Sequence, residues 1–281
     1  MLNEGSPRQA SQIFTRNLVR SFMNQLAVQD RYLHKMAAKA TKSIEARVAK
    51  DTEFAAAAVN GLMGPAGSVN FDQLTKTKTV EKIVVEANAD ALKQILPLFE
   101  KLIAHPGPND SKAAASARQS LASLLLAIVR ARASAQNPDE TTEAALQQAL
   151  FIFVRFAYFS GPEDKETAPQ PALTEQTQEL FRNRINSCLN SIIANQKYAA
   201  SLPYAVTRKI RDAAKSEEYG KFVVKMDERI HESVSRAFKS LKKLSSMVRC
   251  PSPSRTYELT NCHREGKTKS PASAPSNSST Q

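Results

Sequence analysis

Apolar residues recur every three or four positions in two long segments of the chain. Between residues 30 and 50 they are Leu33, Met36, Ala37, Ala40, Ile44 and Val48. Between residues 220 and 248 they are Val223, Met226, Ile230, Val234, Ala237, Leu241 and Leu244. This spacing places apolar side chains on one face of an α-helix. It predicts two amphipathic helices whose apolar faces are buried.

Glycine and proline cluster between the apolar segments, where they would end helices. Gly61, Gly64 and Pro65 close one segment, and Pro203 closes a later one. Pro97 should kink or divide the helix that contains it, because proline removes a backbone donor and crowds the preceding turn. The expected helices are 9–28, 30–50, 52–62, 78–87, 88–104, 112–135, 139–159, 174–197, 205–218 and 220–248.

Composition adds no signal for β-strands: the chain has 8 glycines, no tryptophan and 6% aromatic residues. We therefore predict an all-α fold, an α-solenoid of HEAT/armadillo-like helical hairpins over residues 9–248. No motif repeats at a fixed period, so this prediction depends on the pairing of successive helices. Residues 1–8 should form a flexible N-terminus, and the Ser/Pro-rich residues 249–281 a disordered tail.

The net charge of +12 is concentrated at the two ends of the predicted domain. Residues 1–50 hold 9 basic and 3 acidic side chains, and residues 201–250 hold 12 and 6, whereas the segment 51–200 is close to neutral. A strongly basic chain favours an anionic partner. The absence of an apolar run of about 20 residues argues against a membrane-spanning helix.

On a helical wheel the basic side chains of both ends form stripes. These are Arg31, Lys35, Lys39 and Lys42 in the first helix, and Lys221, Lys225, Arg229, Arg236, Lys239 and Lys243 in the second. Such stripes can follow a phosphate backbone and make binding salt-dependent. The alternative is that they are solvated faces of amphipathic helices. Both interpretations remain open.

The segment Asn70–Glu86 is the most distinctive stretch of the sequence. A Gly-Pro turn leads to two apolar residues and then to Thr75-Lys76-Thr77-Lys78-Thr79, which opens a helix. Lys76 and Lys78 beside free N–H groups at a helix start would form an anion site. Alternatively, the threonines bond the helix start and the lysines are solvated. The segment is not a P-loop, since the required glycine spacing is absent.

The sequence has few candidates for catalysis or metal binding. Its aspartates are scattered, without the adjacent pair that a two-metal polymerase needs. Cys250, Cys262 and His263 could ligate zinc, but they lack a C-x₂-C pair. Cys188 is expected to be a small core residue, and the three widely spaced cysteines favour a reducing compartment. We therefore predict no catalytic residue, no metal site, no cofactor and no small-molecule substrate.

The run Asn70-Phe71-Asp72-Gln73-Leu74-Thr75-Lys76-Thr77-Lys78-Thr79-Val80-Glu81 resembles the DNA polymerase phi family. Supporting matches are Leu62-Met63-Gly64-Pro65, Asp30-Arg31-Tyr32-Leu33-His34-Lys35, Ala117-Arg118-Gln119-Ser120-Leu121-Ala122 and Arg184-Ile185-Asn186-Ser187-Cys188-Leu189. The resemblance covers roughly residues 9–200 and extends more loosely to about residue 248. Members of that family are much longer, so this chain resembles an internal fragment or truncated product.

The resemblance implies a nucleolar helical-repeat protein that associates with ribosomal DNA and supports rRNA synthesis and ribosome assembly. Two hypotheses follow. The chain contacts rDNA or pre-rRNA through its basic helix faces and the Thr/Lys segment, or it is a protein-binding scaffold for transcription or pre-ribosome assembly factors that makes no direct nucleic-acid contact. Despite the family name, we expect no polymerase activity.

Overall fold

The computed structural model describes residues 12–48, 50–107, 110–134, 140–161, 168–216, 219–221, 235–237, 239–244 and 246. Every named element in these ranges is an α-helix, which confirms the predicted all-α class. The helices are α2 (Arg16–Ala27), α3 (His34–Val48), α4 (Thr52–Met63), α5 (Phe71–Thr75), α6 (Thr79–Glu86), α7 (Ala89–Ala104), α8 (Ser111–Ala133), α9 (Glu140–Tyr158), α10 (Glu175–Ile193) and α11 (Ser201–Ser216).

Short polar residues define where several of these helices begin. The side chain of Asn88 accepts a hydrogen bond from the Ala91 N–H at 2.9 Å at the start of α7. Asp110 accepts from Ala113 N–H at 3.0 Å at the start of α8. Each such cap satisfies a backbone donor that has no partner within the helix and contributes about 1 kcal/mol. These caps fix the helix boundaries locally, before any tertiary packing.

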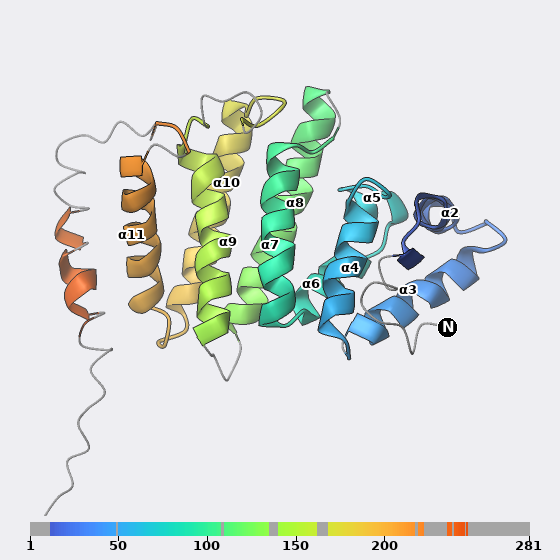
Figure 1. Cartoon of the computed structure of the whole chain (residues 1–281), viewed down its shortest axis with the longest axis horizontal. Coiled ribbons are helices and arrows are strands. Elements are labelled where there is room, and N and C mark those ends of the chain that lie inside the picture. The colour runs from blue at the N-terminus through green and yellow to red at the C-terminus, as the bar shows by residue number, and fades with distance from the viewer. Residues whose placement is uncertain are drawn as a thin grey trace, which may run out of the picture.

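The helices stand side by side in a row that follows the order of the chain, from α2 and α3 at one end to α11 near the other (Figure 1). The main contacts of each helix are with elements at most three places away along the chain, such as α4 with α7 and α9 with α11. This stepwise packing is compatible with an α-solenoid. The HEAT/armadillo repeat type stays a prediction.

A continuous apolar core runs through the row, and α8 and α9 supply much of it. Arg118 of α8 lies within this core with 1% of its surface exposed. Its guanidinium donates to the carbonyl of Ile103 at 3.0 Å and to the carbonyls of Pro171 and Ala172. Arg118 thus ties the end of α7 to the segment that precedes α10, and burial lowers its pKa.

Two breakers predicted to end helices lie inside them. Gly61 lies within α4, where a Cβ atom would come 2.3 Å from the Cβ of Phe14; the glycine allows residues 12–14 to pack against the helix. Pro203 lies in the first turn of α11, where a missing N–H costs nothing, so α11 begins at Ser201 rather than at residue 205. Pro97 is exposed on α7, which continues undivided to Ala104.

The buried face of α3 differs from the prediction. Ala37, Ile44 and Val48 are buried as expected, but Leu33 and Met36 are 45% and 62% exposed. Thr41 is buried instead, because its hydroxyl donates to the Ala38 carbonyl at 2.8 Å and needs no outside partner. The apolar face of α3 therefore continues onto the protein surface at the start of the helix.

Some predicted features lie outside the described residues. These are the N-terminus 1–8, the tail 249–281 with its Cys250, Cys262 and His263, and most of the predicted helix 220–248. Within that helix, residues 235–237 and 239–244 are described and helical. The domain boundaries at residues 9 and 248 stay predictions.

Candidate nucleic-acid interface

The Thr/Lys segment folds around a single carboxylate, that of Asp72 on the short helix α5. Its Oδ1 accepts the Val80 N–H at 3.0 Å, and its Oδ2 accepts the Glu81 N–H at 2.9 Å. These are the N–H groups at the start of α6 that the anion-site hypothesis took to be free. They are already paired, so these two N–H groups are not available to a bound anion.

The three threonines form a chain of hydroxyls beneath the lysines. Thr75 donates to the Phe71 carbonyl at 2.7 Å and lies 2.8 Å from the Thr77 hydroxyl. Thr79 donates to Thr77 at 3.3 Å, and Thr77 donates to Asp72 at 3.3 Å. The threonines thus bond the helix start through Asp72 and fix the path of the backbone between α5 and α6.

The two lysines of the segment point outward. Both are exposed, and Lys78 approaches Glu81 at 3.6 Å. Lys76 ends α5 with φ at 54°, a left-handed conformation that costs a residue with a Cβ about 1 kcal/mol. Glycine or asparagine would adopt this conformation at lower cost. The chain thus holds a cation at a position where the backbone favours a smaller residue.

The environment of Asp72 opposes the ionised carboxylate. Burial, with a smaller contribution from the charge of Glu81, raises its pKa by more than the N–H groups of Val80 and Glu81 and the Thr77 hydroxyl lower it. The carboxyl group therefore acts chiefly as a pair of hydrogen-bond acceptors that organise the segment.

The structure places this segment beside the basic stripe of α3. A hollow of about 490 Å³ is lined by the end of α2, by His34 and Ala38 of α3, and by Thr75, Lys76 and Thr77. Ala38 lies three residues after Lys35 and four before Lys42, so both lysines are its neighbours on the helix surface. Lys76 of the Thr/Lys segment therefore lines the hollow, and Lys35 and Lys42 of the α3 stripe lie next to a residue that lines it.

We call these cations the basic surface: Arg31, Lys35, Lys39, Lys42, Lys76 and Lys78. All six are exposed. Apart from the contact of Lys78 with Glu81, none makes an ion pair with another described residue. Unpaired cations on one surface produce a positive potential that attracts polyanions.

Two further residues of this region were not predicted as part of the site. Tyr32 is 97% exposed directly after Arg31, and an exposed aromatic ring among cations can stack on a nucleic-acid base. His34 lines the hollow, with its Nδ1 3.0 Å from the Gln25 carbonyl oxygen. The sequence shows that Tyr32 directly follows a basic residue, but the spacing of apolar residues does not reveal that its ring is exposed.

The second predicted stripe lies at the opposite end of the row from the basic surface (Figure 1). Its residues Lys221, Arg236, Lys239 and Lys243 are exposed, while Lys225 and Arg229 lie outside the described residues. Lys221 is fixed to the end of α9, where its backbone N–H donates to the Ser160 hydroxyl at 3.0 Å. The two stripes do not form one continuous surface.

We searched the described part of the chain for metal-ligating groups, reactive cysteines and membrane-spanning helices. It contains no group of three or more His, Cys, Asp or Glu residues placed to hold a metal ion. Cys188 is buried as predicted, and burial raises the pKa of its thiol to about 12. Among the described helices, none has the length and hydropathy required to cross a membrane.

Comparison with known proteins identifies relatives of this chain. The family model described as DNA polymerase phi matches residues 1–257. The rDNA transcriptional regulator pol5 of Schizosaccharomyces pombe is 27% identical over 248 residues, which cover 84% of this chain and 25% of that protein. The rDNA transcriptional regulator POL5 of Saccharomyces cerevisiae is 27% identical over 241 residues, or 82% of this chain and 22% of that protein.

The chain thus spans about a quarter of the length of these curated relatives. No solved structure matches it significantly. The family model covers more than nine-tenths of the sequence and includes both the α3 stripe and the Thr/Lys segment. The chain therefore belongs to the DNA polymerase phi family.

Proposed function

We propose that this chain is a non-catalytic helical regulator of rDNA transcription that contacts rDNA or pre-rRNA through its basic surface. The relatives named above are regulators of rDNA transcription, which supports the role. The observation that carries the contact is a hollow lined by Lys76 of the Thr/Lys segment and by Ala38 of α3, which neighbours Lys35 and Lys42 on the helix surface. A nuclear and nucleolar location and a contribution to ribosome biogenesis follow from that role.

The physical basis is electrostatic. Each lysine or arginine that neutralises a phosphate releases a condensed counterion, so several cations on one surface give salt-dependent affinity. The rigid Asp72 and threonine network beneath Lys76 and Lys78 reduces the entropy lost when these cations engage a backbone. Tyr32 adds a stacking surface beside them.

The absence of catalysis is part of the proposal. The relatives are named as transcriptional regulators, not as polymerases. A polymerase holds two metal ions with clustered carboxylates, and no such cluster occurs in the described residues. A primer-extension activity that a single Asp→Asn change abolished would contradict this part of the proposal.

The proposal is tested in cells with two matched variants of the full-length protein. The basic-surface variant carries Lys35→Glu, Lys39→Glu and Lys76→Glu. The control variant carries three reversals of the same sign at exposed positions elsewhere, Lys93→Glu, Lys112→Glu and Lys215→Glu. Chromatin immunoprecipitation with and without ribonuclease measures rDNA occupancy, and pulse labelling measures nascent pre-rRNA.

We expect the basic-surface variant to lose rDNA occupancy and to lower pre-rRNA synthesis, while the control variant behaves as wild type. Loss of occupancy on ribonuclease treatment would identify pre-rRNA as the ligand. Unchanged occupancy and synthesis in the basic-surface variant would contradict the proposal and favour a scaffold that needs no nucleic-acid contact.

A further inference from the structure

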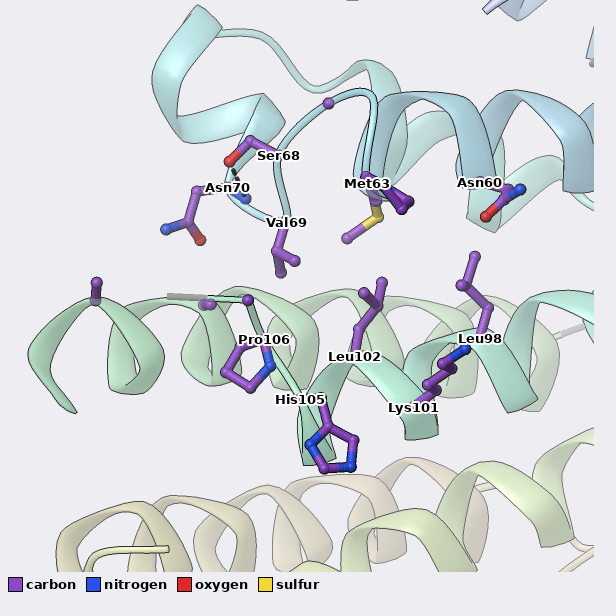
Figure 2. A pocket seen from close by; sticks show the side chains of 16 residues that line it. Asn60, Met63, Ser68, Val69, Asn70, Leu98, Lys101, Leu102, His105 and Pro106 are labelled. Carbon is purple, nitrogen blue, oxygen red and sulfur yellow. Dashed lines mark hydrogen bonds between the residues drawn. The ribbon is translucent and has the colours of Figure 1, made fainter. Parts of the chain in front are cut away.

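A groove of about 750 Å³ lies away from the hollow of the basic surface, between the α4–α5 turn and helices α7 and α8. Pockets that hold ligands in proteins have volumes of roughly 300–1,000 Å³. Figure 2 shows Met63 and Val69 on one side of the groove and Leu98 and Leu102 of α7 on the other, with their side chains directed toward one another. The groove thus has apolar walls on both sides.

The wall formed by the α4–α5 turn is rigid. A Cβ at Gly64 would lie 2.3 Å from the Asn60 carbonyl oxygen, and one at Gly67 would lie 1.9 Å from the Leu62 carbonyl oxygen. The turn is therefore wound too tightly for any residue but glycine. Hydrogen bonds from Gly67 N–H to the Gly64 carbonyl and from Ser68 N–H to the Leu62 carbonyl, at 3.0 and 2.9 Å, hold it. This wall of the groove is therefore formed before a ligand binds.

The polar groups of the groove favour an anionic occupant. Lys101 of α7 and His105, which directly follows this helix, line it, and neither makes an ion pair with a described residue. No aspartate or glutamate lines it. Lys101 is an exposed cation, and an imidazole donates an N–H in either tautomer. A ligand that pairs with Lys101 carries a carboxylate, and the walls favour an aliphatic group beside it.

We propose that this groove binds a short segment of a partner protein that carries an aliphatic side chain next to aspartate or glutamate. The aliphatic side chain packs between Val69 and Leu102, and the carboxylate pairs with Lys101. A peptide suits the site because the walls are apolar and an exposed lysine lies beside them. This inference does not depend on the nucleic-acid contact, since the groove shares no lining residue with the hollow beside α3.

The experiment selects ligands from a phage-displayed library of random dodecapeptides on the full chain. The synthesised consensus peptide, labelled with fluorescein, is then titrated by anisotropy against three variants. Lys101→Glu reverses the cation of the groove, and Leu102→Asp places an anion in its wall. Lys93→Glu is the matched control, an exposed lysine of α7 that does not line the groove. Thermal melts followed by circular dichroism verify that each variant is folded. If Leu102→Asp unfolds the protein, Lys101→Glu still tests the groove, because Lys101 is exposed and its substitution should not affect folding.

We expect the enriched peptides to share an aliphatic residue adjacent to an acidic one. Their affinity should fall about tenfold in Lys101→Glu, the scale of one lost charge pair, and stay unchanged in Lys93→Glu. Three results would overturn the inference: no enrichment, enriched peptides without acidic residues, or equal affinity for wild type and Lys101→Glu. Binding of a uridine oligonucleotide that Lys101→Glu abolishes, without any peptide binding, would reassign the groove to nucleic acid.

Discussion

The substitution Asp72→Ala tests whether the Thr/Lys segment depends on one carboxyl group. It removes the acceptors of the Val80 and Glu81 N–H groups, at 3.0 and 2.9 Å, and of the Thr77 hydroxyl. Leaving a buried donor unpaired costs about 1–3 kcal/mol, and loss of a helix cap costs about 1 kcal/mol. Because Asp72 is half-buried, water can reach some of the donors that it leaves unpaired and can accept their hydrogen bonds in its place. We expect the free energy of unfolding to fall by about 2 kcal/mol.

Urea unfolding followed by circular dichroism measures this change, and a thermal melt should show a midpoint lowered by about 5 °C. Asp72→Asn is the matched control, because it keeps one acceptor oxygen and nearly the same volume. Since burial raises the pKa of Asp72, the charge itself is not favoured in the fold. Asp72→Asn should therefore cost less than half as much as Asp72→Ala.

The difference in stability between wild type and Asp72→Asn should depend on pH, and the raised pKa of Asp72 gives the sign of this dependence. The folded protein binds this proton more tightly than the unfolded chain, in which the carboxyl has its ordinary pKa of 3.8. The contribution of Asp72 to stability is complete below that value and is lost as the pH rises through the folded pKa. The stability of wild type relative to Asp72→Asn should thus fall as the pH rises above 3.8 and level off once the folded carboxyl group is ionised. A stability of Asp72→Ala within about 0.5 kcal/mol of wild type would refute the account of this segment.

Three further experiments test the backbone at Lys76, the hydrogen bonds of Arg118 and the burial of Cys188. Lys76→Gly should keep or slightly raise the stability measured in urea, because glycine adopts the φ of 54° without strain, while lowering nucleic-acid affinity; a stability loss of about 1 kcal/mol would contradict this. Arg118→Met should lower the free energy of unfolding by about 3 kcal/mol, since it leaves three carbonyl oxygens without their donor; a neutral effect would show that water replaces the guanidinium. In a Cys250→Ser/Cys262→Ser background, Cys188 should react with a thiol reagent only after unfolding, because burial raises its pKa to about 12; rapid labelling of the folded protein would show that the thiol is accessible.

Helix positions could be predicted from the sequence where apolar periodicity and caps agree, and less well where tertiary packing decides. Helices α7 and α9 match their predicted ranges to within a residue. The five-residue helix α5 was missed because it is too short to show a period. Gly61 was misinterpreted because glycine also serves close helix packing, which depends on Phe14 far away in the chain.

The candidate site was predictable in its residue types but not in its geometry. The Thr/Lys run and the α3 stripe are visible in the sequence, whereas their position around one hollow depends on how α3 packs against α6. The sequence also gives no indication that Asp72, rather than a bound anion, pairs with the start of α6. A local pattern cannot specify which of several polar groups reaches an N–H group across a turn.

The salt dependence of nucleic-acid binding tests the basic surface most directly. Fluorescence anisotropy with an rDNA duplex and with a pre-rRNA fragment gives the binding constant across a range of salt concentrations. If the basic-surface variant loses three phosphate contacts, the slope of log K against log salt should become shallower by about 2–3 relative to wild type. The control variant, with the same net charge, should keep the wild-type slope. Equal slopes for all three proteins would contradict the assignment of the surface formed by α3 and the Thr/Lys segment.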